Sequence, residues 1–282
     1  MPYNAVNDVK MRILRSVLTT LCIAMLLGSS AASFATEREE LDNSGWVLGL
    51  ELGISAALLV GVAFLDAPES CRWCATNTFD ESIRSALKAE DDAAARLASD
   101  ILVFGVVSSA ALAVSALPPL LDDEGIAALQ NVGIVLSSTL AATATVGLIK
   151  VLAARERPIE HHHPGKLENA AERYVSFFSG HTSIAFALAS SATTVAYLRG
   201  EDWALYSGLG LGALALTGAS LRIVGDAHWA SDVLVGMGVG TLFGVGLPLL
   251  LHGRSKSDSR NQLSAQPLFL PTAPQFGVTL SW

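Results

Sequence analysis

The feature that most constrains this chain is a series of six apolar runs, each close to the length that crosses a lipid bilayer as a helix. They are Trp46 to Leu65, Ile101 to Leu121, Val132 to Ile149, Ser183 to Leu198, Trp203 to Leu221 and Val233 to Leu251. A transmembrane helix needs about 20 apolar residues, with allowance for tilt. The sequence therefore predicts an all-α, polytopic membrane bundle with about six transmembrane helices.

The composition agrees with a membrane protein and argues against a nucleic-acid-binding protein. Hydrophobic residues make up 51% of the chain and charged residues 16%, whereas soluble domains average about 25% charged residues. The formal net charge is -8 and no basic stripe is present. Since nucleic-acid binding relies on concentrated Lys and Arg, we expect a lipid bilayer, and not a nucleic acid, as a partner.

Residues 1–35 have the form of a secretory signal. Lys10, Arg12 and Arg15 precede an apolar run from Val17 to Leu27, and Ser33-Phe34-Ala35 offers small residues for cleavage. The run is short for a span, which favours cleavage over the alternative of an uncleaved anchor helix.

The rest divides into three parts. Residues 36–99 hold the first span and a polar connection, in which Phe79, Ile83, Leu87 and the Ala-rich run to Leu97 have the spacing of one amphipathic helix at the membrane interface. A packing role is favoured for it over a lid or substrate ramp. Residues 100–252 form the core bundle, and 253–282 a peripheral tail.

Glycines recur at every fourth position, which predicts close helix packing; they are Gly208 and Gly212, then Gly236, Gly240 and Gly244.

Cys71 and Cys74 lie in the polar connection, and Cys22 lies in the signal-like segment. No thioredoxin-like pattern surrounds the pair, and a zinc site would lack two ligands. We therefore expect a local disulfide in an oxidising compartment, with two free thiols as the alternative.

Three polar clusters interrupt the later apolar runs: Lys150 to Pro158, Phe178 to Ser183 and Leu221 to Asp232. Because successive spans alternate in direction, all three should lie on one face of the membrane. Lys150, Arg157 and Arg222 together would place three cations there, a charge that an oxyanion such as phosphate compensates.

The other two clusters add donors and a nucleophile. Ser179 is placed to cap a helix, which leaves the amides of Gly180 and His181 free to face an anion. His228 and Asp232 are four residues apart, so on a helix the carboxylate can accept one imidazole proton and leave the other nitrogen nucleophilic.

These clusters resemble the motifs of the type 2 phosphatidic acid phosphatase and vanadium haloperoxidase superfamily, Lys-x6-Arg-Pro, Pro-Ser-Gly-His and Ser-Arg-x5-His-x3-Asp. Phe178 stands in place of the family proline and Leu221 in place of its serine, with no loss of charge or of catalytic histidines. The resemblance covers about the C-terminal two thirds of the chain after the signal.

The resemblance implies a catalytic mechanism without a metal or a cofactor. His228 would attack phosphorus, Asp232 would orient its imidazole, and His181 would protonate the leaving alkoxide. The phosphate oxygens would bind Lys150, Arg157, Arg222 and the amides of Ser179 and Gly180.

The consecutive histidines His161, His162 and His163 could suggest a metal cluster, but consecutive residues converge poorly on one ion, and we expect a solvated loop instead.

The expected function is hydrolysis of a membrane lipid phosphate or diphosphate, such as phosphatidate, an isoprenoid diphosphate or a lipid A phosphate. A vanadate-dependent haloperoxidase, a soluble periplasmic acid phosphatase and a non-catalytic lipid-binding relative remain as alternatives. We expect a multi-pass protein of the bacterial cell membrane with a periplasmic site, although six spans after a cleaved signal would place the site in the cytoplasm. Oligomeric state is left open.

Overall fold

The computed structural model describes residues 41, 45–167 and 169–253 of the 282-residue chain. The predicted signal and nearly all of the predicted tail lie outside the described residues. The described part is helical, with one isolated β-bridge between Trp73 and Arg155. The predicted all-α class is confirmed.

The elements follow the chain as α2 (Gly45–Ala63), α3 (Thr78–Leu87), α4 (Asp92–Asp100), the π-helical η1 (Ile101–Val107), α5 (Ser108–Leu121), α6 (Gly125–Ala153), α7 (Pro158–His162), the 3-10 turn η2 (Ala170–Glu172), α8 (Gly180–Leu198), α9 (Ala204–Val224) and α10 (Ala230–Leu251). α4, η1 and α5 form one continuous helical span from Asp92 to Leu121. Helix therefore begins at Asp92 and not at the predicted Ile101.

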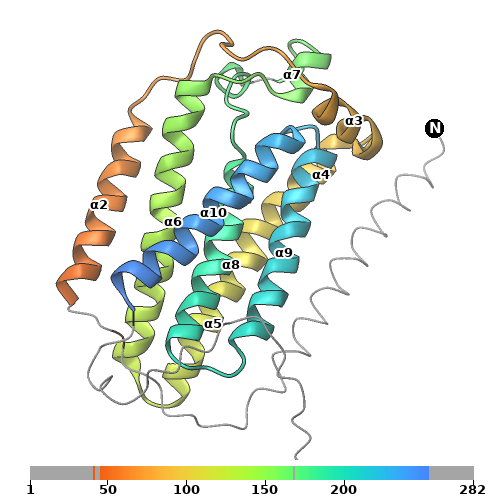
Figure 1. Ribbon diagram of the computed structural model, residues 1–282. Helices are drawn as coiled ribbons and strands as arrows, with labels where there is room; N and C mark the ends of the chain where they lie inside the picture. Colours follow the sequence, from red (N-terminus) through yellow and green to blue (C-terminus); the bar gives the residue numbers. More distant parts are fainter. Residues whose placement is uncertain (1–40, 42–44, 168, 254–282) are drawn as a thin grey trace, which may run out of the picture.

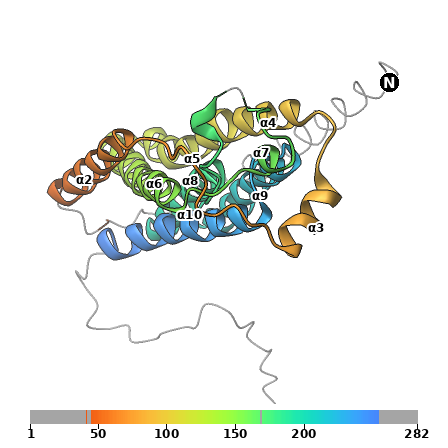
Figure 2. The same cartoon turned by 90° about the horizontal axis from the view of Figure 1, so that it is seen from above.

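All six predicted spans are helical, and five helical segments of the described chain are long and apolar enough to cross a membrane. The remaining predicted span, Ser183 to Leu198, falls in α8, which is not one of these five. α8 lies at the centre of the bundle, packed against α5, α6, α9 and α10 (Figure 2). Its polar residues Ser183, Ser191 and Thr194 are buried against these neighbours. An interior helix faces protein instead of lipid, so it tolerates polar side chains that a lipid-facing span would not.

The helices alternate in direction, and this brings the three polar clusters together. The end of α6, the start of α8 and the α9–α10 connection all lie at the same end of the bundle, beside α3 and α7 (Figure 1). The turns at 122–124 and 199–203 lie at the opposite end, as the short connections require. We refer to the first end as the catalytic end.

The polar connection after α2 differs from the prediction of one amphipathic helix. It contains two helices, α3 and α4, each with a side-chain N-cap, Asn77 accepting from the amide of Asp80 and Asp91 from that of Ala94. Two caps within a short stretch start two separate helices. Both helices pack on α9 at the catalytic end, which is the packing role favoured from the sequence.

α10 crosses α8 at very short range through glycine. A Cβ at Gly236, Gly240 or Gly244 would lie 2.7, 2.3 or 2.1 Å from an oxygen atom of α8. Gly208 similarly meets Thr193, whereas a Cβ at Gly212 has nothing within 4 Å. The predicted close packing thus holds for four of these five glycines, and Gly212 takes no part in it.

We predict that Gly240→Ala lowers the free energy of unfolding by about 1–3 kcal/mol, since the added methyl would overlap the Ser183 carbonyl of α8. Gly238→Ala is the matched control, because it makes the same change on the same helix with no atom within 4 Å. Chemical denaturation in detergent measures both. Equal destabilisation of the two variants would contradict the packing account.

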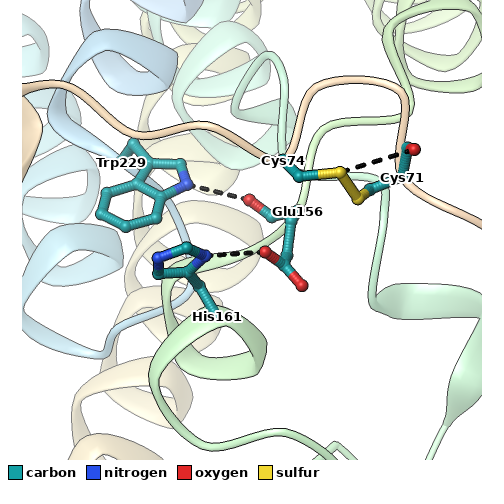
Figure 3. The surroundings of a disulfide bond; sticks show 5 residues. All are labelled: Cys71, Cys74, Glu156, His161 and Trp229. Carbon is teal, nitrogen blue, oxygen red and sulfur yellow. Dashed lines mark hydrogen bonds and ion pairs between the residues drawn. A yellow bond between two sulfur atoms is a disulfide. The ribbon is translucent and has the colours of Figure 1, made fainter.

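Cys71 and Cys74 form the predicted local disulfide (Figure 3). The segment that it closes lies against the end of α6: the Arg72 amide donates to the Ala154 carbonyl at 3.0 Å, and the Glu156 amide to the Trp73 carbonyl at 3.2 Å. The disulfide loop therefore supports the backbone on either side of Arg155.

Candidate active site

The first cluster places two cations at the end of α6 and the start of α7. Lys150 lies in the last turn of α6. Its Nζ lies close to Gly180 at the start of α8, since a Cβ added to that glycine would be 3.7 Å away. Arg157 precedes Pro158, the first residue of α7, where the fixed φ of proline suits a helix start. The buried Arg157 Nε has no hydrogen-bond partner among the described residues, and Nη2 lies 3.8 Å from Glu172.

The second cluster forms the N-terminus of α8. Ser179 is the predicted N-cap: its Oγ accepts from the amide and hydroxyl of Thr182, at 3.4 and 2.9 Å. The Ser179 amide donates to the Asp232 carbonyl at 3.1 Å, so it is not available to phosphate as the resemblance implied. Free donors at this terminus are expected from the first helical residues, Gly180 and His181.

A carboxylate that the sequence did not suggest lies between the histidine and arginine of this site. Asp100 Oδ1 is 2.8 Å from His181 Nε2 and 2.9 Å from Arg222 Nη1. His181 Nε2 lacks the alignment of a hydrogen bond, and Arg222 Nε has no partner in the described chain. Asp100 is itself half exposed, so it screens these two groups without burying them.

The third cluster positions His228 differently from the prediction. His228 Nδ1 lies 2.8 Å from the Ser176 carbonyl but 3.7 Å from Asp232 Oδ2. A carbonyl only accepts, so Nδ1 carries the proton and Nε2 is left with its lone pair. The hydroxyl of Ser176 in turn donates to Asp232 at 2.6 Å. Asp232 is thus linked to the imidazole through Ser176 and not by the direct hydrogen bond expected from the spacing.

The surroundings keep this imidazole neutral. His228 is 1% exposed, and burial lowers the pKa of its ring well below the usual value, as do the positive charges of Arg157, Lys150 and Arg222. The three cations and His181 therefore lie within electrostatic range of His228. The structure therefore brings together the predicted nucleophile, the predicted acid and the predicted phosphate-binding cations.

We predict a pH-dependent stability that depends on His228. A histidine whose pKa falls on folding stabilises the protein above its unfolded pKa of about 6.5, and this contribution is lost as pH decreases below that value. Below pH ~6.5, the unfolding free energy of the wild type should fall more steeply than that of His228→Gln, by up to about 1.4 kcal/mol per pH unit. Chemical denaturation in detergent at several pH values measures both slopes.

The control for this experiment is His163→Gln, which changes an exposed histidine. It should keep the wild-type slope. If His228→Gln also keeps that slope, the imidazole is not held neutral by its surroundings.

A cavity of about 520 Å³ opens onto this site. Its walls combine cations, two carboxylates and apolar side chains, and are formed by Arg96, Asp100, Phe104, Arg157, Ile159, Leu167, Glu172, His181, Arg222 and Ala227. Ala227 lines the cavity, whereas the adjacent His228 is buried and is not among the lining residues. A charged group that enters would reach Arg157, Arg222 and His181 before it reaches the imidazole.

Arg155 is a buried residue at the centre of the supporting network. It donates to Asp232 through a short contact, to Ser231 at 2.8 Å and to Asp80 of α3 at 2.7 Å. Its guanidinium lies 4.1 Å from the ring centre of Trp73, within range for a cation–π interaction. This arginine therefore ties the disulfide loop and α3 to the start of α10.

Asp80 completes the network from the other side. It accepts from the Ser231 amide at 2.8 Å and hydroxyl at 2.7 Å. Burial alone would raise the pKa of Asp80, but these hydrogen bonds and Arg155 outweigh it, and the pKa lies below its usual value. Asp80 therefore stays ionised opposite Arg155.

Asp226 and Trp229, which flank His228, both have packing roles. Asp226 accepts two hydrogen bonds from Arg84, at 2.6 and 2.8 Å, and its carbonyl accepts from the amide of Ile159. Trp229 donates from Nε1 to the Glu156 carbonyl at 2.8 Å (Figure 3). These contacts fix the loop that carries His228.

Residues 131–256 match the family model of the PAP2 superfamily. A segment of 80 residues is 42% identical to the protein named lipid A 1-phosphatase of Porphyromonas gingivalis, over 28% of this chain and 17% of that protein. The chain thus spans less than a fifth of the length of this relative. No solved structure matches the chain.

The matched region contains the catalytic-end residues from Lys150 to Asp232, where the three motifs converge. Over residues 131–256 the chain is similar to the PAP2 superfamily, which agrees with the resemblance of its motifs to the type 2 phosphatidic acid phosphatases.

Proposed function

We propose that this protein is a lipid phosphatase that needs no catalytic metal and forms a phosphohistidine on His228. The observation that carries the proposal is the buried imidazole of His228, kept neutral by burial and by the charges of Arg157, Lys150 and Arg222, next to a cavity that Arg157, Arg222 and Ala227 line. Unpartnered guanidinium Nε atoms on Arg157 and Arg222 supply donors that a tetrahedral oxyanion would satisfy.

These positions support the following reaction. His228 Nε2 attacks phosphorus while the bond to the lipid oxygen breaks, and His181 donates a proton to that oxygen. The cations stabilise the charge that spreads over the equatorial oxygens. Water then attacks the phosphohistidine and gives one proton back to His181, while the P–N bond breaks, inorganic phosphate leaves and the His228 imidazole is restored.

Asp100 adds a condition for binding. Its carboxylate already lies within 3 Å of His181 and Arg222, so a phosphate oxygen that binds the same two groups must displace it. Since Asp100 is half exposed, it can rotate toward solvent when the substrate enters.

The substrate class is a phosphate ester or diphosphate of a membrane lipid. The site lies at one end of a bundle whose helices can cross a membrane, which suits a substrate with its headgroup at the bilayer surface. The similarity to a protein named lipid A 1-phosphatase makes lipid A phosphates the first candidates to assay. Phosphatidate and isoprenoid diphosphates are the alternatives.

We place the protein in a bacterial cell membrane, with the catalytic end in the periplasm. The Cys71–Cys74 disulfide is at this end of the molecule, and disulfides persist in oxidising compartments. In intact cells, an impermeant thiol reagent should label the cysteines only after an impermeant reductant has been added. Labelling that requires cell lysis would place the site in the cytoplasm.

Phosphate release from a panel of lipid phosphates tests the function. The panel contains lipid A, phosphatidate and an isoprenoid diphosphate in detergent micelles with excess chelator. We expect release from at least one lipid, without added metal. No release from any of them, together with halide oxidation after vanadate is added, would favour the haloperoxidase alternative.

A further inference from the structure

A second group of chemically active side chains lies outside the phosphate site, where α3 faces α7. Glu81 of α3 and the histidines His161 and His162 of α7 each place a ligand atom within 4.8 Å of the others. His162 Nε2 is already 3.2 Å from Glu81 Oε2. Two of the three consecutive histidines therefore converge on one carboxylate, contrary to the expectation that this stretch is only a solvated loop.

The surroundings of His161 match those of a metal ligand. Its Nδ1 lies 2.8 Å from Glu156 Oε2, and Figure 3 shows this contact as a dashed line. Metal-binding histidines commonly donate one ring N–H to a carboxylate, which fixes the ring and leaves the other nitrogen for the ion. Glu156 is itself held in place, because its carbonyl accepts from Trp229 and its amide donates to Trp73.

Two imidazoles, one carboxylate and an open fourth position suit Zn²⁺. Zinc bonds of about 2.0–2.2 Å require ligand atoms roughly 3.3 Å apart, closer than the 4.8 Å limit seen here. The side chains of Glu81, His161 and His162 are 34%, 34% and 31% exposed, and rotation of Glu81 and His162 toward the oriented His161 can close the remaining distance. Their exposure also gives an ion a path from solvent.

Such an ion would link two parts of the catalytic end. Glu81 follows Asp80, which binds Arg155 and Ser231, and α7 begins directly after Arg157. Among the described contacts, the His162–Glu81 pair is the one that joins the side chains of α3 and α7 here. A bound ion would replace this weak, half-exposed pair with coordinate bonds.

We infer that Glu81, His161 and His162 form a binding site for a divalent transition metal of the zinc class, which clamps α3 to α7 and takes no part in phosphoryl transfer. Glu156 orients His161 from behind. The inference does not depend on the proposed phosphatase function, because the ligands are separate from His228 and the cavity.

The test is zinc binding by the full chain, purified in detergent without a polyhistidine tag and stripped with a chelator that is then removed. Equilibrium dialysis at micromolar zinc with elemental analysis should give one zinc per chain, and zinc should raise the thermal midpoint. Glu81→Gln and His162→Gln should each weaken binding by about tenfold or more and abolish the thermal shift.

Two variants separate this site from other histidines. His163→Gln removes the neighbouring histidine outside the cluster, and His228→Ala removes an imidazole of the phosphate site; both should bind zinc as the wild type does. The inference fails if Glu81→Gln and His162→Gln bind zinc as tightly as the wild type, or if either control loses binding. It fails equally if the wild type binds no zinc at micromolar concentration. Thermal melts without zinc identify variants that have lost their fold.

Discussion

His228→Ala is expected to reduce phosphate release from the best lipid substrate by on the order of 10³-fold or more, because it removes the group that we propose bonds to phosphorus. The loss should appear in kcat, since the cations that we propose bind phosphate remain. Steady-state assays in detergent micelles measure it. The imidazole is buried and contacts the Ser176 carbonyl, so a thermal melt must accompany the assay.

The matched control is His163→Ala, the same change at an exposed histidine of the same end of the bundle. It should leave kcat within a factor of about two, as expected for a surface substitution. A folded His228→Ala protein with activity near that of the wild type would remove His228 from the mechanism.

The second large effect is expected at Arg155. Arg155→Met leaves the carboxylates of Asp80 and Asp232, both fully buried, without their shared cation. Breaking a buried ion pair from one side costs about 3–5 kcal/mol. We therefore expect a fall of this size in the free energy of unfolding, together with a lower kcat, because Asp232 holds Ser176 and through it His228.

Arg72→Met is the control, since Arg72 lies in the neighbouring disulfide loop but is exposed, and its guanidinium donates to carbonyls at the end of α6. It should cost less than about 1 kcal/mol. A double-mutant cycle of Arg155→Met with Asp80→Asn measures the pair itself, and a coupling near zero would contradict the network described here.

The site cations and histidines were predictable because their positions are fixed by local pattern. Lys150, Arg157 and Arg222 lie at the ends of apolar runs, and alternation of the helices alone brings those ends to one face. Ser179 was predictable as an N-cap for the same reason, because capping depends on residues within one turn.

The supporting residues were not predictable, because their contacts depend on how distant segments fold back. Arg155 and Asp80 are separated by 75 positions and meet only once α3 has packed at the catalytic end. The partner of His228 is a backbone carbonyl, which any residue at position 176 would offer. The spacing of His228 and Asp232 therefore suggested the wrong hydrogen bond between two correctly grouped side chains.

Asp100 was missed for a different reason. The sequence placed a boundary at residue 100 between the polar connection and the core bundle, whereas α4 continues through η1 into α5. A carboxylate at a boundary between two segments is expected to be solvated. Within the continuous helix, however, Asp100 contacts His181 and Arg222.

The most direct measurement is a rapid-quench experiment with a lipid substrate labelled with ³²P in its phosphate. The account predicts a transient protein-bound label that is stable in alkali, labile in acid, located on His228 and absent from His228→Ala. Turnover without any bound label, or a label on another residue, would contradict it.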